Sequence, residues 1–165
     1  LDALLRQLGL VSGERPARAA ASSTVQLPPQ DILLVEDNEI NAMLACKLLE
    51  RHQHRVLVAH NGIEALGMID MCRFDLVFMD MYMPEMGGLE ATQRIVEKDH
   101  LTTMMITHNM RDAIAYGNRL VMMYDGHIVV DVSGEEKKHL TVEQLLNLFS
   151  QASGSDEADD KLLLS

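Results

Sequence analysis

Short apolar runs alternate with segments of helical periodicity along most of this chain. The runs predict buried strands, because they are too short for helices and are bounded by turn-forming residues. Between them, apolar side chains recur three or four positions apart, as in Ile40, Met43 and Leu44, which predicts amphipathic helices. Repeated strand–helix units predict an α/β fold with a mostly parallel sheet and helices on both faces. The predicted strands are 32–35, 55–59, 76–79, 104–107, 120–124 and 127–132.

Capping residues mark where the helices begin. Asp37 or Asn38 can cap the first helix, and Asn109 can cap the fourth. Thr141 followed by Gln144 forms a capping box before the last helix. Other helices are expected from residue 62 and over about 88–97. The capping residues therefore place the helix starts between the same apolar runs that predict the strands.

Composition predicts a compact centre with two polar ends. We expect a single α/β domain over residues 31–150, with the dipeptide at 125–126 turning a hairpin into an antiparallel edge strand. Residues 1–30 are expected to hold a short helix and then a linker rich in alanine, serine, proline and arginine. The acidic tail 151–165 is expected to be disordered.

Charge and hydropathy exclude two classes of function. The chain of 165 residues carries a formal charge of −11, so we expect no nucleic-acid partner, which would require basic residues to neutralise phosphates. No apolar run approaches the ~20 residues of a spanning helix, so no membrane insertion is expected. Cys46 and Cys72 lack the spacing of metal ligands and are expected to be reduced thiols, which indicates a cytoplasmic protein.

Carboxylates gather where two of the predicted strands end. Asp80 ends the run 75–80, and Glu36 and Asp37 follow the run 32–35. The carboxyl ends of parallel strands meet at one edge of a sheet, where such folds bind ligands. Three neighbouring carboxylates repel one another unless a cation joins them, so the pattern predicts a magnesium ion.

The predicted ion would take one or two of these carboxylates, a backbone carbonyl such as that of Tyr82, and water molecules. With the ion in place, Asp80 is a candidate nucleophile toward phosphorus, which would form an aspartyl phosphate. The alternative is that the acids are ordinary loop residues or helix caps. Two acidic clusters on alternate strands, with Pro84 and the glycines at 87 and 88 shaping the next loop, favour the ion site.

Three motifs resemble those of the receiver domain of bacterial two-component response regulators. They read LLVEDN at 33–38, NGIEAL at 61–66 and DLVFMDMYMPEMGG at 75–88. The resemblance covers residues 31–98 and implies a flavodoxin-like fold with the parallel strand order 2-1-3-4-5. The predicted hairpin would then add an antiparallel strand at the edge of that sheet.

The same resemblance implies roles for the acids. Asp80 would accept a phosphoryl group, and magnesium would be held by Glu36, Asp37, Asp80 and the Tyr82 carbonyl. The phosphoryl group would come from a histidine kinase or a phosphotransfer protein and would later be lost by hydrolysis.

The second half departs from the receiver pattern. Thr107 matches the hydroxyl residue that ends the fourth receiver strand, and it would contact the phosphoryl oxygens. Receivers usually end their fifth strand with a Lys-Pro pair, which occurs nowhere in this chain, and Lys137 and Lys138 come too late to replace it. A cation that would pair with Asp80 is therefore missing, and phosphorylation is expected to be impaired.

Residues 101–149 instead resemble the end of an ATP-binding subunit of an ABC transporter. The matching segments are LTTMMITHNM at 101–110, YGNRLVMM at 116–123 and GHIVVD at 126–131. The resemblance implies that His108 corresponds to a histidine that touches the γ-phosphate of ATP. This chain has no Gly-x-x-x-x-Gly-Lys-Ser/Thr loop to hold phosphates, so we expect His108 to be a strand-end or helix-capping residue instead.

The two resemblances together predict a chimera, with a receiver segment at 31–98 and a transporter segment at 99–150. Three hypotheses follow: a magnesium-dependent phosphoacceptor, a recombined or designed fold without physiological function, and a nucleotide-binding ATPase fragment. The missing phosphate-binding loop disfavours the third. The chain is therefore not expected to be an enzyme, apart from weak hydrolysis of its own phosphoryl group.

Overall fold

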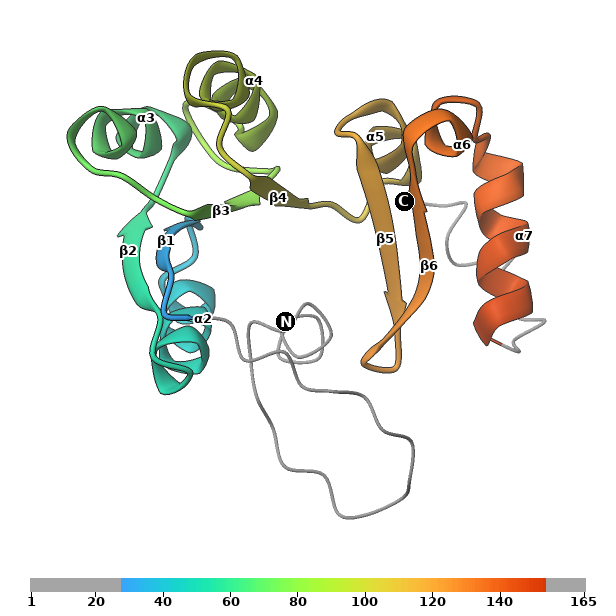
Figure 1. Ribbon diagram of the computed structural model, residues 1–165, viewed down its shortest axis with the longest axis horizontal. Helices are drawn as coiled ribbons and strands as arrows, with labels where there is room; N and C mark the ends of the chain where they lie inside the picture. Colours follow the sequence, from blue (N-terminus) through green and yellow to red (C-terminus); the bar gives the residue numbers. More distant parts are fainter. Residues whose placement is uncertain (1–27, 154–165) are drawn as a thin grey trace. The chain divides into compact units, whose positions relative to one another are not determined.

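The computed structural model describes residues 28–153, which fold as two compact units that meet in the chain between Ile106 and Thr107 (Figure 1). The first unit contains β1 (Asp31–Val35), α2 (Glu39–Arg51), β2 (Arg55–Ala59), α3 (Gly62–Met71), β3 (Leu76–Asp80), α4 (Gly88–Asp99) and β4 (Thr103–Ile106). The second contains α5 (Met110–Ala115), β5 (Arg119–Tyr124), β6 (His127–Ser133), α6 (Gly134–Lys138) and α7 (Val142–Ser153).

A four-stranded parallel sheet in the order β2-β1-β3-β4 forms the centre of the first unit. Val35 at the end of β1 pairs with Ala59 of β2 and with Met79 of β3, so these strands end at one edge. Asp80 pairs with Ile106 of β4. The sheet and its helices confirm the predicted α/β fold of the flavodoxin-like type.

Side chains of β1 and β3 alternate between the two faces of this sheet, so each face has its own core. α2 covers one face, and α3 and α4 cover the other (Figure 1). The α2 side buries Ile32, Leu34, Leu76, Phe78, Ala42, Ala45 and Leu49. The opposite side buries Leu33, Val35, Val77, Met79, Ala65, Ile69, Phe74, Ala91 and Ile95. Each large aliphatic or aromatic side chain contributes about 1.5–3 kcal/mol on burial, which holds β1 and β3 at the centre.

Side-chain caps begin the helices close to the predicted positions. The Asn38 side chain accepts hydrogen bonds from the first turn of α2, and Asn61 and Asn109 do the same for α3 and α5. Before α7, the Thr141 N–H donates to Gln144 Oε1 (2.9 Å), and the Gln144 N–H donates to Thr141 Oγ1 (3.2 Å). The predicted capping box is therefore confirmed.

The second unit is a β-hairpin packed with three helices. Asp125 and Gly126 turn the chain with φ angles of 46° and 76°, which suit a two-residue hairpin connection. Leu120 of β5 and two valines of β6 are buried against Leu145 of α7, and apolar residues of α5 complete this core. The predicted hairpin is confirmed.

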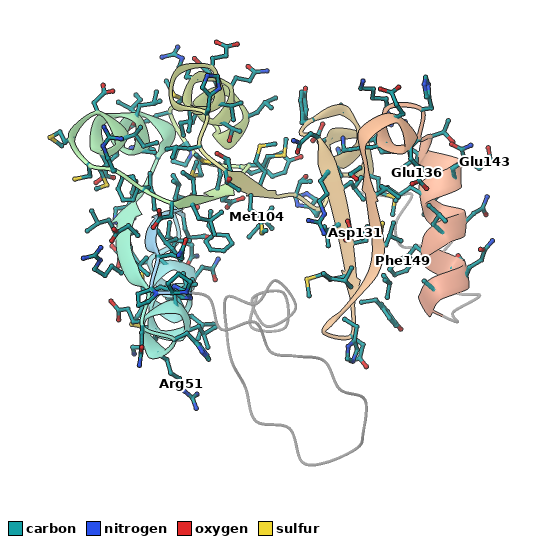
Figure 2. All side chains as sticks on the ribbon, viewed as in Figure 1. Arg51, Met104, Asp131, Glu136, Glu143 and Phe149 are labelled. Carbon is teal, nitrogen blue, oxygen red and sulfur yellow. The ribbon has the colours of Figure 1, made fainter. Side chains whose placement is uncertain are left out.

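Two further contacts hold this hairpin, and Figure 2 labels one residue of each, Asp131 and Phe149. Arg119 of β5 pairs with Asp131 of β6 at 2.6 Å, and this hydrogen-bonded arginine lowers the pKa of the Asp131 carboxyl. The rings of Tyr124 and Phe149 meet edge to face, with their centroids 5.5 Å apart. These contacts tie the two strands together and join the hairpin tip to α7.

Three expectations differ from the structure. Residues 120–124 were expected as a fifth parallel strand, but within the described chain β5 pairs with β6 alone. A two-residue turn closes this pairing locally, whereas a parallel pairing needs a long crossover. One domain was expected over 31–150, whereas the structure has two units. α7 also continues to Ser153, into the segment 151–165 that was expected to be disordered.

Several predictions lie outside the described residues, namely the helix near the start of the chain, most of the linker before residue 28, and the tail from residue 154. Within residues 28–153, no helix has both the length and the apolar character needed to span a membrane.

Candidate functional site

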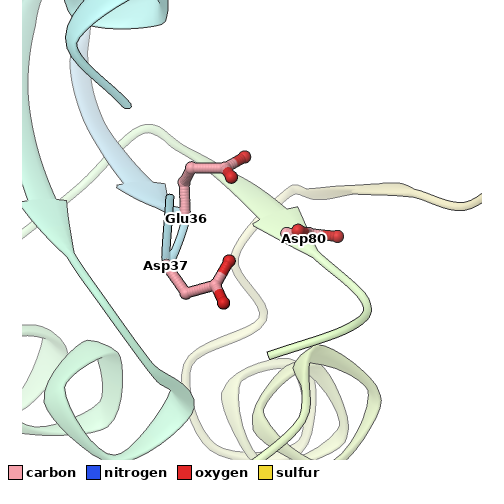
Figure 3. A group of neighbouring side chains, drawn as sticks. All are labelled: Glu36, Asp37 and Asp80. Carbon is pink, nitrogen blue, oxygen red and sulfur yellow. The ribbon is translucent and has the colours of Figure 1, made fainter. Parts of the chain in front are cut away.

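The first unit brings the three predicted acids together at the carboxyl edge of its sheet (Figure 3). Glu36 and Asp37 follow β1, and Asp80 is the last residue of β3. Each side chain offers one carboxylate oxygen, and these oxygens all lie within 4.8 Å of one another. The convergence follows from the register, because Val35 pairs with Met79 and the next residue on each strand is an acid.

The donor set fits a hard divalent cation. Magnesium binds oxygen ligands at about 2.0–2.1 Å, so two ligands on opposite sides of one ion are about 4 Å apart. The chosen oxygens of the cluster lie within 4.8 Å of one another, so small side-chain rotations would bring them to this spacing. Asp37 is exposed while Glu36 and Asp80 are half-buried, so water can complete the coordination.

The acids of the cluster have no basic partner among the residues that the structure describes. Lysine and arginine ion pairs within residues 28–153 include those on Asp31, Glu90, Asp131 and Glu135. Three carboxylates at this spacing repel one another unless a cation or protons intervene. The site is therefore electrostatically prepared for a metal ion.

Backbone groups orient the Asp80 carboxylate. The Tyr82 N–H donates to Asp80 Oδ1 at 3.2 Å, across the sharp turn that follows β3. α4 then begins at Gly88, whose N–H donates to the Met81 carbonyl at 3.2 Å. The start of α4 therefore lies next to the end of β3. Because the Tyr82 N–H contacts Oδ1, the other carboxylate oxygen of Asp80 stays available to a ligand.

Two residues that the sequence analysis did not assign to the site contact Glu36. The Asn41 side-chain amide donates to Glu36 Oε1 at 3.1 Å, and a ring nitrogen of His60 lies 3.3 Å from the Glu36 carbonyl. Asn41 is in the first turn of α2 and His60 follows β2. The helical spacing of Asn41 after Asp37 was the available signal, but a hydrogen bond to Glu36 depends on side-chain directions that spacing does not specify.

The structure leaves the remaining candidates without a confirmed role. Thr107 and His108 belong to the second unit, and Thr107 Oγ1 accepts a hydrogen bond from the Asn109 N–H at 3.1 Å, next to the cap of α5. Magnesium binding by the Tyr82 carbonyl and phosphoryl contact by Thr107 stay predictions. Lys137, which the sequence placed too late to replace the missing strand-end lysine, donates to the backbone carbonyls of Ile114 and Tyr116.

Comparison with known proteins identifies the family of the chain. The profile of the response regulator receiver domain matches residues 32–126, which is more than half of the chain. The chain therefore belongs to the response regulator receiver family, whose domains act in two-component signalling. The match continues past β4 to residue 126, although β5 pairs outside the parallel sheet.

The chain is similar to curated proteins of two different kinds. Probable histidine kinase 1 from rice (Oryza sativa subsp. indica) is 47% identical over 64 residues, which is 39% of this chain and 7% of the kinase. A tyrosine transport ATP-binding protein from Clostridioides difficile is 45% identical over 64 residues, which is 39% of this chain and 26% of that protein. The chain thus spans a small part of each.

A solved structure shows the same fold. The N-terminal domain of a response regulator receiver protein from Methanoculleus marisnigri is 29% identical and superposes with a TM-score of 0.50. The alignment covers 53% of this chain and 76% of that domain.

Proposed function

We propose that this chain is a magnesium-dependent phosphoacceptor and that Asp80 is the residue phosphorylated. The observation that carries the proposal is the convergence of Glu36, Asp37 and Asp80 within 4.8 Å, at the end of two central strands. Glu36, Asp37 and Asp80 would hold the ion, with the Tyr82 carbonyl as a further ligand. The ion would neutralise negative charge on the transferring phosphoryl group.

The chemistry of Asp80 is a displacement at phosphorus. With a phosphohistidine as the donor, the free carboxylate oxygen of Asp80 forms a bond to phosphorus while the bond from phosphorus to the histidine nitrogen breaks. The electron pair of the broken bond stays on the imidazole of the donor, and the product is an aspartyl phosphate. The hydrogen bond from the Tyr82 N–H holds Asp80 in one orientation, which favours in-line attack.

A phosphohistidine-bearing partner, either a histidine kinase or a phosphotransfer protein, is the donor that we propose. The similarity to a rice protein named as a histidine kinase supports this class of partner. An apolar surface close to the acids also supports it, because Ile40, Met43 and Leu44 on α2 are 72%, 52% and 58% exposed. Large exposed apolar groups at helical spacing beside a reactive site are typical of a surface that binds another protein.

A mixed origin is proposed for the chain as well. Its similarity to a transport ATP-binding protein supports the predicted transporter-derived segment. We propose that this segment does not hydrolyse nucleotides, because the chain has no phosphate-binding loop. The second unit would then lack the strand-end lysine of a receiver, and we expect phosphorylation to be slow.

Intact-mass measurement after incubation with acetyl phosphate and magnesium tests the proposal. We expect the wild-type chain to gain the mass of one phosphoryl group, and we expect Asp80→Asn to gain none. Asp125→Asn makes the same chemical change in the hairpin turn and should behave as the wild type. Absence of a gain in the wild-type chain at saturating donor and magnesium would refute the proposal, and so would an equal gain in Asp80→Asn.

A further inference from the structure

We propose that Asn41 is a positioning residue that sets the orientation of Glu36 and thereby the affinity of the acid cluster for magnesium. The inference rests on the proposed function, since it concerns the same site. It deepens that function by naming a residue outside the acidic cluster on which metal binding depends.

The geometry of the first turn of α2 carries the inference. The Asn41 amide nitrogen donates to Glu36 Oε1 at 3.1 Å, and the Asn38 N–H approaches the same oxygen at 3.4 Å. Both donors therefore hold one oxygen of the carboxylate, which leaves the other oxygen for a cation. Asn41 is itself held, because its own N–H donates to Asn38 Oδ1 at 3.2 Å.

The type of donor matters for the charge of the site. A neutral amide orients the Glu36 carboxylate without cancelling its negative charge, whereas a lysine or arginine would compete with the metal ion. A glutamate side chain without a partner samples several rotamers, and ordering it on metal binding costs entropy. Asn41 reduces that cost before the ion arrives, so its removal should weaken binding about 3- to 10-fold.

A purely structural role for Asn41 predicts a different result. The cap of α2 is supplied by Asn38, and the Asn41 side chain is exposed and directed to Glu36. Alanine and leucine also favour a helix more than asparagine does. Replacing Asn41 by either residue should therefore keep or raise the thermal stability while it weakens magnesium binding.

Calorimetric titration of the full chain with magnesium chloride, together with thermal unfolding, tests this. We expect Asn41→Ala and Asn41→Leu to raise the magnesium Kd about 3- to 10-fold with an unchanged or higher Tm. Asn41→Gln retains an amide donor and should recover part of the affinity. Gln93→Ala removes an exposed amide from α4, away from the acids, and should leave the Kd unchanged.

The outcomes separate this inference from the proposed function. If the wild-type chain binds no magnesium, both fail. If the wild-type chain binds magnesium and both Asn41 variants bind it equally well, the inference fails and the proposed function stands. A lower Tm in both variants with an unchanged Kd would assign Asn41 a structural role, which also overturns the inference.

Discussion

At the scale of single residues, Gly88 decides how closely α4 can approach the backbone of Asp80. A Cβ atom added at this position would lie 1.9 Å from the Asp80 carbonyl oxygen and 2.9 Å from the Met79 side chain. No side chain fits at these distances, so the backbone would have to move. The motif at 75–88 indicated a loop shaped by glycines, and the structure supplies the reason for the second of them.

We predict that Gly88→Ala lowers the free energy of unfolding by about 1–3 kcal/mol and weakens magnesium binding, because the displaced backbone carries Asp80. Gly67→Ala is the matched control, since nothing lies within 4 Å of the added atom on α3. That change should stabilise the chain by about 0.5–1 kcal/mol. Urea unfolding and magnesium titration measure both effects, and equal behaviour of the two variants would contradict this account of Gly88.

At the scale of elements, α5 is a short helix that depends on side chains at both ends. Helices of this length are unstable alone, because nucleation costs more than a few hydrogen bonds return. Asn109 caps its beginning. At its end, the buried Lys137 ammonium donates to the carbonyls of Ile114 (2.6 Å) and Tyr116 (2.8 Å), and burial lowers the pKa of this lysine. Lys137 of α6 thus caps the C-terminal end of α5.

Lys137→Met should destabilise the second unit by about 1.5–3 kcal/mol, because two carbonyls lose a charged donor. Lys138→Met removes the neighbouring lysine, which is exposed and pairs with Glu135, and should cost less than about 1 kcal/mol. Urea unfolding followed by tyrosine fluorescence compares the variants, with Tyr116 and Tyr124 reporting on this unit. Similar losses in the two variants would argue against the capping role of Lys137.

At the scale of the whole molecule, the two units are stabilised by separate apolar cores. The parallel sheet buries residues on both of its faces, while the hairpin packs its own cluster around Leu145. A substitution in one core should therefore leave the other unit intact.

Hydrogen exchange followed by mass spectrometry tests this independence. Leu145→Ala removes a side chain that is 0% exposed, and we expect it to cost about 2–5 kcal/mol within the second unit. Peptides from 107–153 should exchange faster, while peptides covering β1 and β3 keep their protection. Val77→Ala, in the first unit, should give the reverse pattern. Equal acceleration across both units would show that the chain unfolds as one cooperative body.

Periodicity and capping residues predicted most elements to within about one or two residues. The apolar runs located the six strands of residues 28–153, and Asn38, Asn109 and Thr141 marked helix starts that the structure confirms. α6 was missed, because its sequence of glycine, glutamates and lysines carries no apolar stripe. The convergence of the three acids was predictable once the receiver-like motifs implied that the first and third strands are neighbours, since neighbouring parallel strands that end in register bring their next residues together.

The order of apolar and polar residues by itself determined the strands and their mostly parallel direction, because these follow from local periodicity and from the strand–helix alternation. The receiver-like motifs of the sequence implied the strand order that brings Glu36, Asp37 and Asp80 together. Tertiary structure alone decided that β5 pairs with β6, that Gly88 must be small, and that Asn41 contacts Glu36. Each of these depends on which atoms approach after the chain packs, and packing distances of a few ångströms are not encoded in a repeat of apolar positions.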